Sequence, residues 1–265
     1  MADDLTTDGK VESVTSLLEE IEKSGLLGSP RAHIRMWFRG HADVSWELSP
    51  GVYRPSFGVR DEDERLSKER RLTQDFGVMS AGLLSSPRND VELYFLQQHY
   101  RMPTRLLDWT TNPLAALYFA TMSDPDKEGF LFMMDASRLG PDQSAAWPDG
   151  TEFRGIATSR NGHFERALHP IFRWREPEGR FPSFIVPVRP NHFDRRIALQ
   201  RGCFTFHPPG RGTLTKHENG SLKVYSISPD AKKRLGRELP LLGVDHFTVY
   251  GDLDHLAEYL KSSYA

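Results

Sequence analysis

Cysteine is nearly missing from this chain, because Cys203 is the one thiol among 265 residues. A single thiol cannot form a disulfide within the chain, and it excludes zinc sites that are built from several cysteines. Long apolar runs are also missing, since no window approaches the roughly 18 residues of a membrane-spanning helix. The start, MADDLTTDGK, lacks the basic and then apolar pattern of a secretory signal. These absences predict a cytoplasmic protein without a membrane partner.

An excess of charge of one sign is missing as well. Lysine and arginine number 34, aspartate and glutamate number 36, and the formal net charge is -2. This balance gives no general reason to expect nucleic acid as a partner. Hydrophobic residues make up 38% of the chain and charged residues 26%, which is typical of a folded globular domain with a sizeable core.

The ten histidines do not have the spacing of a metal site, because neither H-x-x-x-H nor H-E-x-x-H occurs. We therefore expect no metal. The nucleophile motif G-x-S-x-G, the phosphate loop G-x-x-x-x-G-K-[ST] and the dinucleotide motif G-x-G-x-x-G are also missing. Enzyme classes that depend on these motifs are not indicated.

Strand-like and helix-like segments follow one another in an irregular order. Alternation and apolar runs predict strands at 33–40, 129–135, 183–188, 203–207, 222–227 and 246–250. Helical spacing predicts helices at 13–25, 90–100, 191–200, 229–239 and 252–261. The highly charged segment 60–71 is typical of a solvated helix face. This order favours an α+β fold over a regular βαβ series.

No repeat or low-complexity linker divides the chain, so we expect one domain over residues 13–262. A flexible tail over residues 1–12 would precede it. The proline- and glycine-rich segment at about 137–182 is the best candidate for a long loop or an insertion.

Polar groups are concentrated in YRMPTRLLDWTTNP, residues 100–113, which runs directly into the apolar LAALYFA. Asn112 and Pro113 predict a helix start, since Asn is a good N-cap and Pro suits the first helical position. The apolar residues that follow on every side predict a buried helix. Its N-terminus either binds an anion such as phosphate or is simply capped.

The residues before this helix have strand character. Alternation places Thr104 and Asp108 on one face and Arg105 and Trp109 on the other. Because an unpaired buried charge is costly, Asp108 and Arg105 either brace the fold through hydrogen bonds and ion pairs or contact a ligand. The sequence leaves both alternatives open.

An earlier segment, FRGHADVSWELSPGVYR, has the same polar and aromatic character. Glycine after Arg39 permits close backbone approach, and the planar guanidinium group of Arg39 can grip phosphate or carboxylate. Together with LQQHYRMPTRLLDWTTNPLAALYFA, RRIALQRGCFTFH and GDLDHLAEYL, this segment resembles the FRG domain family, which is named for the tripeptide at residues 38–40. The resemblance extends over roughly residues 13–260.

A more distant similarity is to ADP-ribosyltransferase-like folds, which implies a split, mixed or antiparallel sheet flanked by helices. In that comparison Arg39 or His41 lies on the first strand, and NPLAALYFA matches the short helix. The similarity implies that Arg39, His41, Thr110 and Gln200 are catalytic. It also implies that further residues contact the ligand, namely His99, Arg105, Asp108, Trp109, Thr111, Tyr118 and Phe119. Trp109, Tyr118 and Phe119 would form a stacking wall for nicotinamide.

These resemblances imply a nucleotide-binding protein with NAD as its substrate, which acts as an ADP-ribosyltransferase or NAD glycohydrolase. A macromolecule would be the acceptor in a transfer reaction, and the role would be that of a toxin or a phage-defence protein. However, Gln200 stands where such enzymes have a glutamate, and an amide supplies no negative charge. Two alternatives therefore stay open. The first is a non-enzymatic module that senses a nucleotide or a protein, and the second is an RNA-directed toxin nuclease that uses His41 and His99.

Overall fold

The computed structural model describes residues 6–84, 86, 88–140, 155–159, 162–173, 180–191, 194–217 and 219–264. Over these residues the chain forms one eight-stranded sheet, in the order β1-β8-β4-β2-β3-β7-β6-β5. The strands are β1 (Gly9–Lys10), β2 (Met36–His41), β3 (Leu106–Thr110), β4 (Gly129–Asp135), β5 (Ala157–Thr158), β6 (Val186–Arg189), β7 (Gly202–Phe206) and β8 (Lys223–Ile227). The two outermost pairs, β1–β8 and β5–β6, are parallel and the inner pairs are antiparallel. A mixed sheet in an α+β fold is therefore confirmed.

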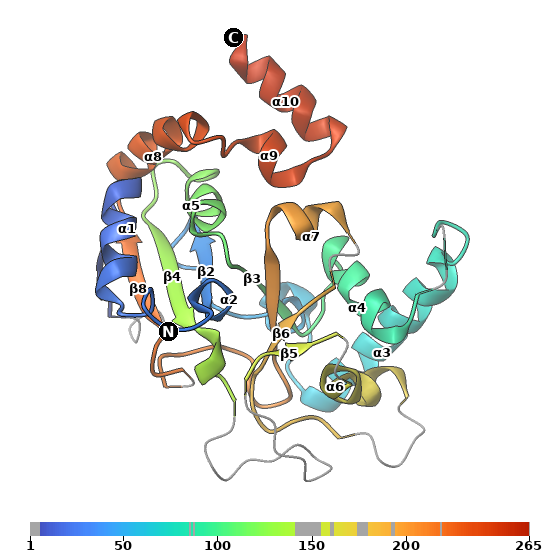
Figure 1. The fold of residues 1–265 in the computed structure, drawn as a ribbon. Helices are drawn as coiled ribbons and strands as arrows, with labels where there is room; N and C mark the ends of the chain where they lie inside the picture. The colour runs from blue at the N-terminus through green and yellow to red at the C-terminus, as the bar shows by residue number, and fades with distance from the viewer. Residues whose placement is uncertain are drawn as a thin grey trace.

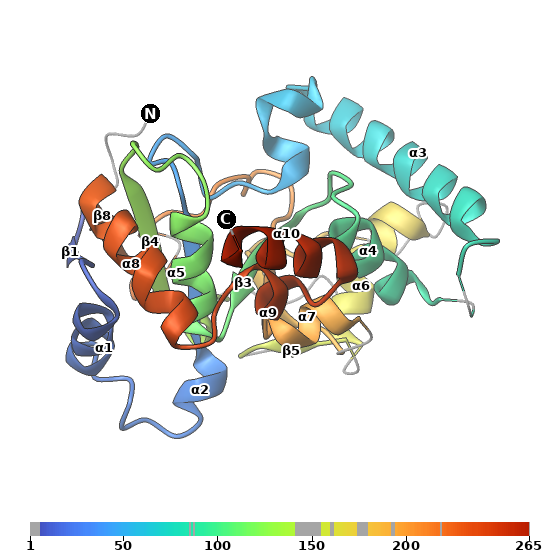
Figure 2. The same cartoon turned by 90° about the horizontal axis from the view of Figure 1, so that it is seen from above.

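Helices cover the sheet in two groups, which lie apart from each other in both views of the ribbon (Figure 1, Figure 2). The first group contains α1 (Val14–Lys23), α5 (Pro113–Thr121) and α8 (Pro229–Leu241). The second contains α3 (Glu62–Ser80), α4 (Asp90–His99) and α6 (His163–Phe172). The remaining helices are α2 (Ala32–Arg35), α7 (Arg195–Leu199), α9 (His246–Tyr250) and α10 (Leu253–Ser263), with short turns η1 (Gly51–Tyr53), η2 (Pro55–Phe57) and η3 (Ala136–Arg138).

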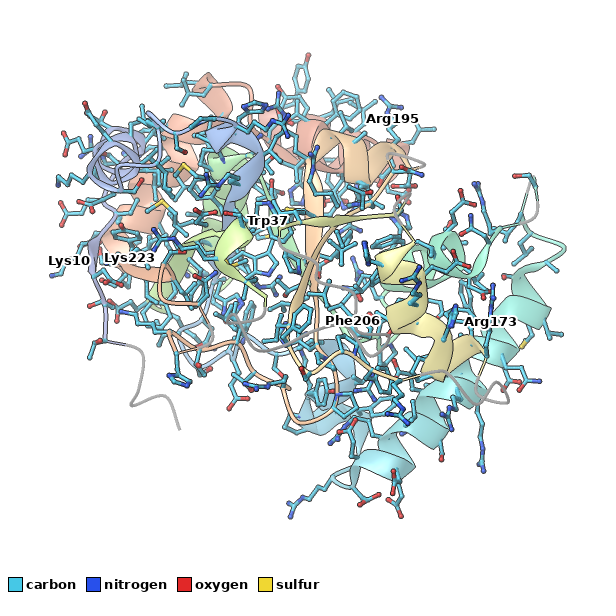
Figure 3. All side chains as sticks on the ribbon, turned by 60° about the horizontal axis from the view of Figure 1, so that its bottom comes forward. Lys10, Trp37, Arg173, Arg195, Phe206 and Lys223 are labelled. Carbon is cyan, nitrogen blue, oxygen red and sulfur yellow. The ribbon has the colours of Figure 1, made fainter. Side chains whose placement is uncertain are left out.

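The core is divided in the same way. One apolar cluster joins β2, β4 and β8 to the first helix group, and a second joins β3, β6 and β7 to α4 and α6. A third cluster, which includes Trp37 and Trp109, lies on the opposite face and runs across both halves of the sheet. Trp37 of β2 and Phe206 of β7 are both fully buried, and Figure 3 shows them within the body of the molecule.

The sheet is split between β2 and β3. These two strands are joined at a single register position, Phe38 opposite Thr110, whereas β2 pairs with β4 along six residues. At the split, α5 crosses close to β2. An added Cβ at Gly40 would lie 2.0 Å from the Ala116 carbonyl oxygen and 2.6 Å from the Ala120 nitrogen, so the glycine allows the close backbone approach that the sequence predicts.

The described part of the N-terminal segment differs from the flexible tail expected over residues 1–12. Gly9 and Lys10 form β1 beside β8, and Val11 is fully buried. Residues 137–182 differ in a similar way from one long loop. Within them, β5 joins the sheet edge and α6 contributes to the core, whereas residues 141–154, 160–161 and 174–179 lie outside the described residues.

Two local expectations are wrong. The strand expected at 33–40 begins at Met36, because residues 32–35 form α2. The segment 246–250 is the helix α9, since Asp245 and Thr248 form a capping box that outweighs the strand propensity of its aromatic and β-branched residues. The charged helix α3 has the solvated face that its composition indicates, and its other side is buried, since Glu69 is 1% exposed. No helix in the described part of the chain is long and apolar enough to span a membrane.

A chain of hydrogen bonds runs through the third apolar cluster. The Trp109 indole Nε1 lies 3.1 Å from Thr205 Oγ1, and that hydroxyl lies 2.9 Å from His207 Nε2. The second ring nitrogen, Nδ1, lies 2.9 Å from the Arg211 carbonyl oxygen. A carbonyl oxygen has no proton to donate, so Nδ1 carries the proton of this hydrogen bond. His207 is therefore neutral with its proton on Nδ1, and burial lowers its pKa to about 3.

Gly40→Ala should destabilise the fold strongly, because the added methyl group would collide with the backbone of α5 rather than with a movable side chain. We expect a loss of about 3 kcal/mol or more in the free energy of unfolding, measured by urea denaturation. The matched control is Gly236→Ala in α8, where nothing lies within 4 Å of the added Cβ. That change should be neutral or stabilise by up to about 1 kcal/mol, and an equal loss in both variants would contradict the packing argument.

Acidification should weaken the fold through His207. The unfolded chain binds a proton at this imidazole near pH 6.5 whereas the folded chain does so near pH 3, so stability is lost as the pH falls between these values. We expect the His207 contribution to fall by about 2 kcal/mol between about pH 7.5 and about pH 5. His207→Gln should flatten the pH dependence of unfolding, whereas His217→Gln, at an exposed histidine, should leave it unchanged.

Candidate functional site

A cavity of about 500 Å³ opens where β2 and β3 separate, between the two helix groups. Its lining comes from β2, β3 and β7, from α4, α5 and α7, and from the loops that contain Trp46, Arg54 and Arg101. Most of the residues predicted as functional line it together, namely Arg39, His41, His99, Asp108, Trp109, Thr110, Phe119 and Gln200. The structure thus brings together residues that are far apart in sequence. Arg39 and Gln200, for example, are separated by 161 positions and line the same cavity.

Arg39 occupies the split between the strands. Its Nη1 donates to the Asp108 carbonyl oxygen at 2.6 Å, and its Nε donates to His41 Nε2 at 2.9 Å. Burial lowers the pKa of Arg39 to about 10, while Asp108 raises it and Arg54 lowers it. The guanidinium group is therefore charged at neutral pH, and its position is fixed on two sides.

His41 holds Arg39 in place and is itself neutral. Its Nε2 accepts from Arg39, and its Nδ1 lies 3.2 Å from the Trp46 carbonyl oxygen, to which it donates. Burial and then the Arg39 charge lower the pKa of His41 well below its usual range. Because both ring nitrogens are engaged, His41 positions Arg39 and has no free lone pair for proton transfer.

Asp108 is the exposed residue of an otherwise buried strand, with 57% of its side chain accessible. Its Oδ2 accepts from Gln98 Nε2 at 2.8 Å and lies 3.9 Å from Arg39 Nη1. The Gln98 amide is oriented in turn by the buried Thr104, whose hydroxyl donates to Gln98 Oε1 at 2.5 Å and accepts from the Leu106 N–H. Asp108 thus presents a held carboxylate to the cavity.

Thr110 and Gln200 are linked at the far end of β3. The Thr110 hydroxyl donates to the Gln200 carbonyl oxygen at 2.5 Å and accepts from the Asn112 N–H at 2.8 Å. Because the Thr110 hydroxyl both donates and accepts within the protein, Thr110 is a positioning residue that holds the backbone at Gln200. The Gln200 side chain lines the cavity, and its Nε2 is buried without a hydrogen-bond partner among the described residues. An unpaired buried donor is costly, which is the sign of a polar group kept for another purpose.

His99 forms part of the α4 wall. Its Nδ1 lies 3.3 Å from Asp194 Oδ1, the same oxygen that caps α7. Burial lowers the pKa of His99, although Asp194 opposes this effect. The ring therefore connects α4 to α7 and is neutral at neutral pH.

The start of α5 is simply capped. Asn112 Oδ1 accepts from the Leu114 N–H, and Pro113 is the first helical residue, as the sequence predicts. The helix lines the cavity through Ala116 and Phe119, which lie past its first turn. Thr111 does not line the cavity, and its backbone N–H donates to the Arg201 carbonyl oxygen. Of the two alternatives for this helix N-terminus, the structure supports the cap.

Arg105 is a core ion-pair member and not part of the cavity wall. It is completely buried, with Nε 2.8 Å from Glu69 Oε2 and Nη2 2.9 Å from Glu62 Oε1. The Tyr94 hydroxyl donates to Glu69 Oε1 and accepts from the Arg105 N–H, while the Tyr53 hydroxyl contacts Arg105 Nη1. Although burial alone lowers the pKa of Arg105, Glu69 and its other neighbours raise it overall. The structure therefore supports bracing for this residue.

Two of the three aromatic residues predicted to stack on a ligand point elsewhere. The Trp109 indole lies on the far face of the sheet, where it donates to Thr205, so this residue lines the cavity without offering its ring. Tyr118 lines a different cavity, and its hydroxyl contacts His246 Nδ1. Phe119 remains on the wall of the main cavity.

Sequence reasoning missed several residues of the wall. Gln98 sits at the end of α4, and Arg54, Arg101 and Arg196 come from two loops and from α7. Gln98 could have been predicted, since it lies in the segment LQQHYRMPTRLLDWTTNPLAALYFA together with Asp108. The three arginines lie in segments quoted above for the FRG resemblance, but nothing in these segments places them at one wall, because their shared position arises from tertiary structure.

The comparisons with known proteins give one result. The family model described as the FRG domain matches residues 34–129. The chain contains an FRG domain. The matched segment is narrower than the resemblance over roughly residues 13–260 and runs from α2 to the first residue of β4. No curated protein and no solved structure matches the chain.

The FRG domain contributes one side of the cavity and the rest of the chain contributes the other. Arg39, His41, His99, Asp108 and Phe119 lie within the matched segment. Arg196 and Gln200 follow it, on α7 and at its end. Within the described ranges, no cluster of three or more His, Cys, Asp or Glu side chains could hold a metal ion.

Arg105→Met should reveal the bracing role by its effect on stability. Removing the guanidinium group leaves the Glu69 carboxylate buried and uncompensated, which should cost about 3–5 kcal/mol in the free energy of unfolding. Urea denaturation would measure this loss. Arg101→Met, at an exposed arginine of the cavity wall, is the matched control and should change stability by less than about 0.5 kcal/mol. Similar stability of both variants would show that the Arg105 ion pairs do not brace the fold.

Proposed function

We propose that the FRG domain protein binds a phosphate-bearing nucleotide in the cavity between β2 and β3, and that NAD is its ligand. The observation that carries this proposal is the charge of the wall. Four arginines, Arg39, Arg54, Arg101 and Arg196, line the cavity together with one carboxylate, Asp108. His41 and His99 add no charge at neutral pH, because burial lowers the pKa of both.

Two of these guanidinium groups repel each other and retain unused donors. The Arg54 charge lowers the pKa of Arg39, so the two groups interact across the wall. Arg54 uses Nε for the Ser49 carbonyl oxygen, and Arg39 uses Nε and Nη1. Among the described residues, Arg39 Nη2 and both Nη atoms of Arg54 have no hydrogen-bond partner. An anion between them would relieve the repulsion and accept these N–H groups, and the planar fork of arginine suits phosphate.

The remaining walls suit a nucleoside. The cavity volume lies in the range of roughly 300–1,000 Å³ that is usual for small-molecule sites. Phe38, Trp46 and Phe119 provide apolar surface for a base, and Asp108, Gln98 and Gln200 provide polar groups for ribose hydroxyls. Pyrophosphate at the arginines and a nucleoside at each side is the arrangement that NAD would fill.

Cleavage of NAD at the nicotinamide ribosyl bond, as an NAD glycohydrolase or an ADP-ribosyltransferase, is the activity that we propose for this site. The alternative is a module that binds the nucleotide without turnover. It is favoured by the neutral Gln200 and by the full engagement of His41, which leave neither residue able to supply charge or a base. An RNA nuclease that relies on His41 for proton transfer receives less support for the same reason. Roles as a toxin or in phage defence would follow from NAD cleavage.

NAD should bind to the purified full-length chain and stabilise it. At about 100 times the dissociation constant, NAD should add about 2.7 kcal/mol to the free energy of unfolding, seen as a rise in melting temperature. Arg39→Gln should weaken binding about 10- to 100-fold, because it removes charge-assisted hydrogen bonds to phosphate. Isothermal titration calorimetry with NAD and with ADP-ribose would measure both dissociation constants.

The matched control is Arg234→Gln, at an exposed arginine that pairs with Glu238 on α8. It should bind NAD as the wild type does. Absence of any calorimetric signal or thermal shift with NAD and ADP-ribose in the wild type would refute the proposed function. Equal weakening by both substitutions would place the ligand away from the cavity.

A further inference from the structure

Asp108 differs from the other charged residues of the molecule in where it lies. It occupies the centre of an interior strand, where its neighbours along the chain are buried, and yet more than half of its side chain is accessible. Asp108 also lines the cavity. An aspartate at such a position is unfavourable for strand formation, so the fold does not require it there.

The carboxylate is held in place, and its ion pair with Arg39 is long. Gln98 donates to Oδ2, whereas Arg39 Nη1 is 3.9 Å from the same oxygen and donates instead to the Asp108 carbonyl oxygen. The other oxygen, Oδ1, has no hydrogen-bond partner in the part of the chain that the structure describes. Oδ2 thus fixes the orientation of the carboxylate, and Oδ1 is free to interact with a ligand.

The hydrogen bonds behind Asp108 leave little freedom. Thr104 is completely buried, and its hydroxyl proton goes to Gln98 Oε1 because its oxygen already accepts from the Leu106 N–H. This assignment turns the NH₂ group of Gln98 toward Asp108. A charged group that is oriented before the ligand arrives is the arrangement that stabilises charge in a transition state most effectively.

Gln200 cannot take this role. Its amide is neutral, and its Nε2 is a donor, which would oppose a developing positive charge. The described cavity wall holds no carboxylate other than that of Asp108. Any positive charge that forms on a ligand in this cavity therefore has a single group to stabilise it.

We infer that Asp108 is the catalytic carboxylate of the cavity and stabilises the cationic ribosyl centre that forms when the nicotinamide bond of NAD breaks. This inference rests on the proposed function, because it requires NAD in the cavity. Gln98 is a positioning residue that acts through Asp108.

The step balances with water as the second reactant. The bond between ribose C1′ and the pyridinium nitrogen breaks, and its electron pair remains on that nitrogen, which gives neutral nicotinamide. The positive charge moves to C1′ and the ring oxygen, where it faces Asp108 Oδ1. A water oxygen then forms the new C1′–O bond, and the proton that it loses passes to Asp108 and on to solvent. The products are ADP-ribose, nicotinamide and one proton.

The test compares turnover with binding in the full-length chain. Asp108→Asn keeps the size of the side chain and an oxygen for Gln98 but removes the charge. We expect kcat for nicotinamide release, measured by chromatography, to fall about 100-fold or more. The dissociation constant for ADP-ribose, measured by calorimetry, should stay within about threefold of the wild-type value, since the lost charge acts mainly in the transition state. Asp230→Asn, at an exposed aspartate on α8, is the matched control and should retain full activity.

Gln98 provides a second, independent readout. Gln98→Ala should lower kcat while leaving Asp108 charged, and Gln98→Asn should not restore it, because the shorter amide cannot reach both Thr104 and Asp108. A merely structural role for Gln98 would lower the melting temperature in proportion to the loss of activity. We expect the melting temperature of both variants to stay close to that of the wild type.

Each outcome bears on one of the two proposals. Failure of the wild type to bind NAD or ADP-ribose would remove the proposed function and the inference with it. Binding of NAD without nicotinamide release would leave the proposed NAD binding in place but would overturn both the proposed cleavage and the inference. Nicotinamide release with unchanged kcat but weaker ADP-ribose binding in Asp108→Asn would also overturn it, by showing that Asp108 binds ribose hydroxyls only.

Discussion

The single register position between β2 and β3 is the constraint on which the rest of the structure depends. Strands that pair along their whole length leave no room between them for side chains. Here the pairing stops after Phe38 and Thr110, so Arg39 can enter the gap and reach the Asp108 backbone. The helix α5 keeps the gap from closing, because it approaches β2 closely at Gly40. The three residues of the FRG tripeptide thus have distinct physical roles. Phe38 pairs with β3, Arg39 enters the gap between the strands, and Gly40 leaves room for the backbone of α5.

Charge is distributed between the core and the cavity according to this geometry. Arg39 lies on β2 and Arg105 directly precedes the neighbouring strand β3, but the surroundings of the two side chains differ. Arg105 is enclosed by Glu62, Glu69 and two tyrosines, so its donors are used within the protein. Arg39 donates to a neutral histidine and a backbone carbonyl oxygen, and the Asp108 carboxylate lies only at the long distance of 3.9 Å from its Nη1. The ion pairs of Arg105 stabilise the fold, whereas the positive charge of Arg39 is only partly compensated by the protein and could attract an anion.

Several of these features follow from the sequence. Asn112 and Pro113 predict the start of α5, and strict alternation along residues 104–109 predicts the faces of β3. The same alternation places Arg105 and Trp109 on the face opposite Asp108, which agrees with their positions outside the ligand-facing surface. The irregular order of strand-like and helix-like segments predicts the α+β class, which the mixed sheet confirms.

Other features could not be predicted, because they depend on contacts between distant segments. Strand propensity indicated a strand at 246–250, and the capping box together with burial of Val249 and Tyr250 against the first core cluster decided for a helix. Arg54 and Arg196 lie in two segments of the FRG resemblance that are well over a hundred residues apart, and neither segment by itself shows that the two arginines meet at one wall. Glu69 lies in a segment whose composition indicates a solvated helix, yet Arg105 draws it into the core.

The division of the cavity between two parts of the chain has a consequence for how such proteins can diversify. The segment that matches the FRG family carries the arginine, the carboxylate and the glutamine that orients it, whereas α7 and its end supply Arg196 and Gln200. Replacement of the α7 segment would alter which molecule fits without disturbing the charged pair across the split. The two sides of the cavity thus come from separate segments of the chain, so that one side can be exchanged while the other is inherited unchanged.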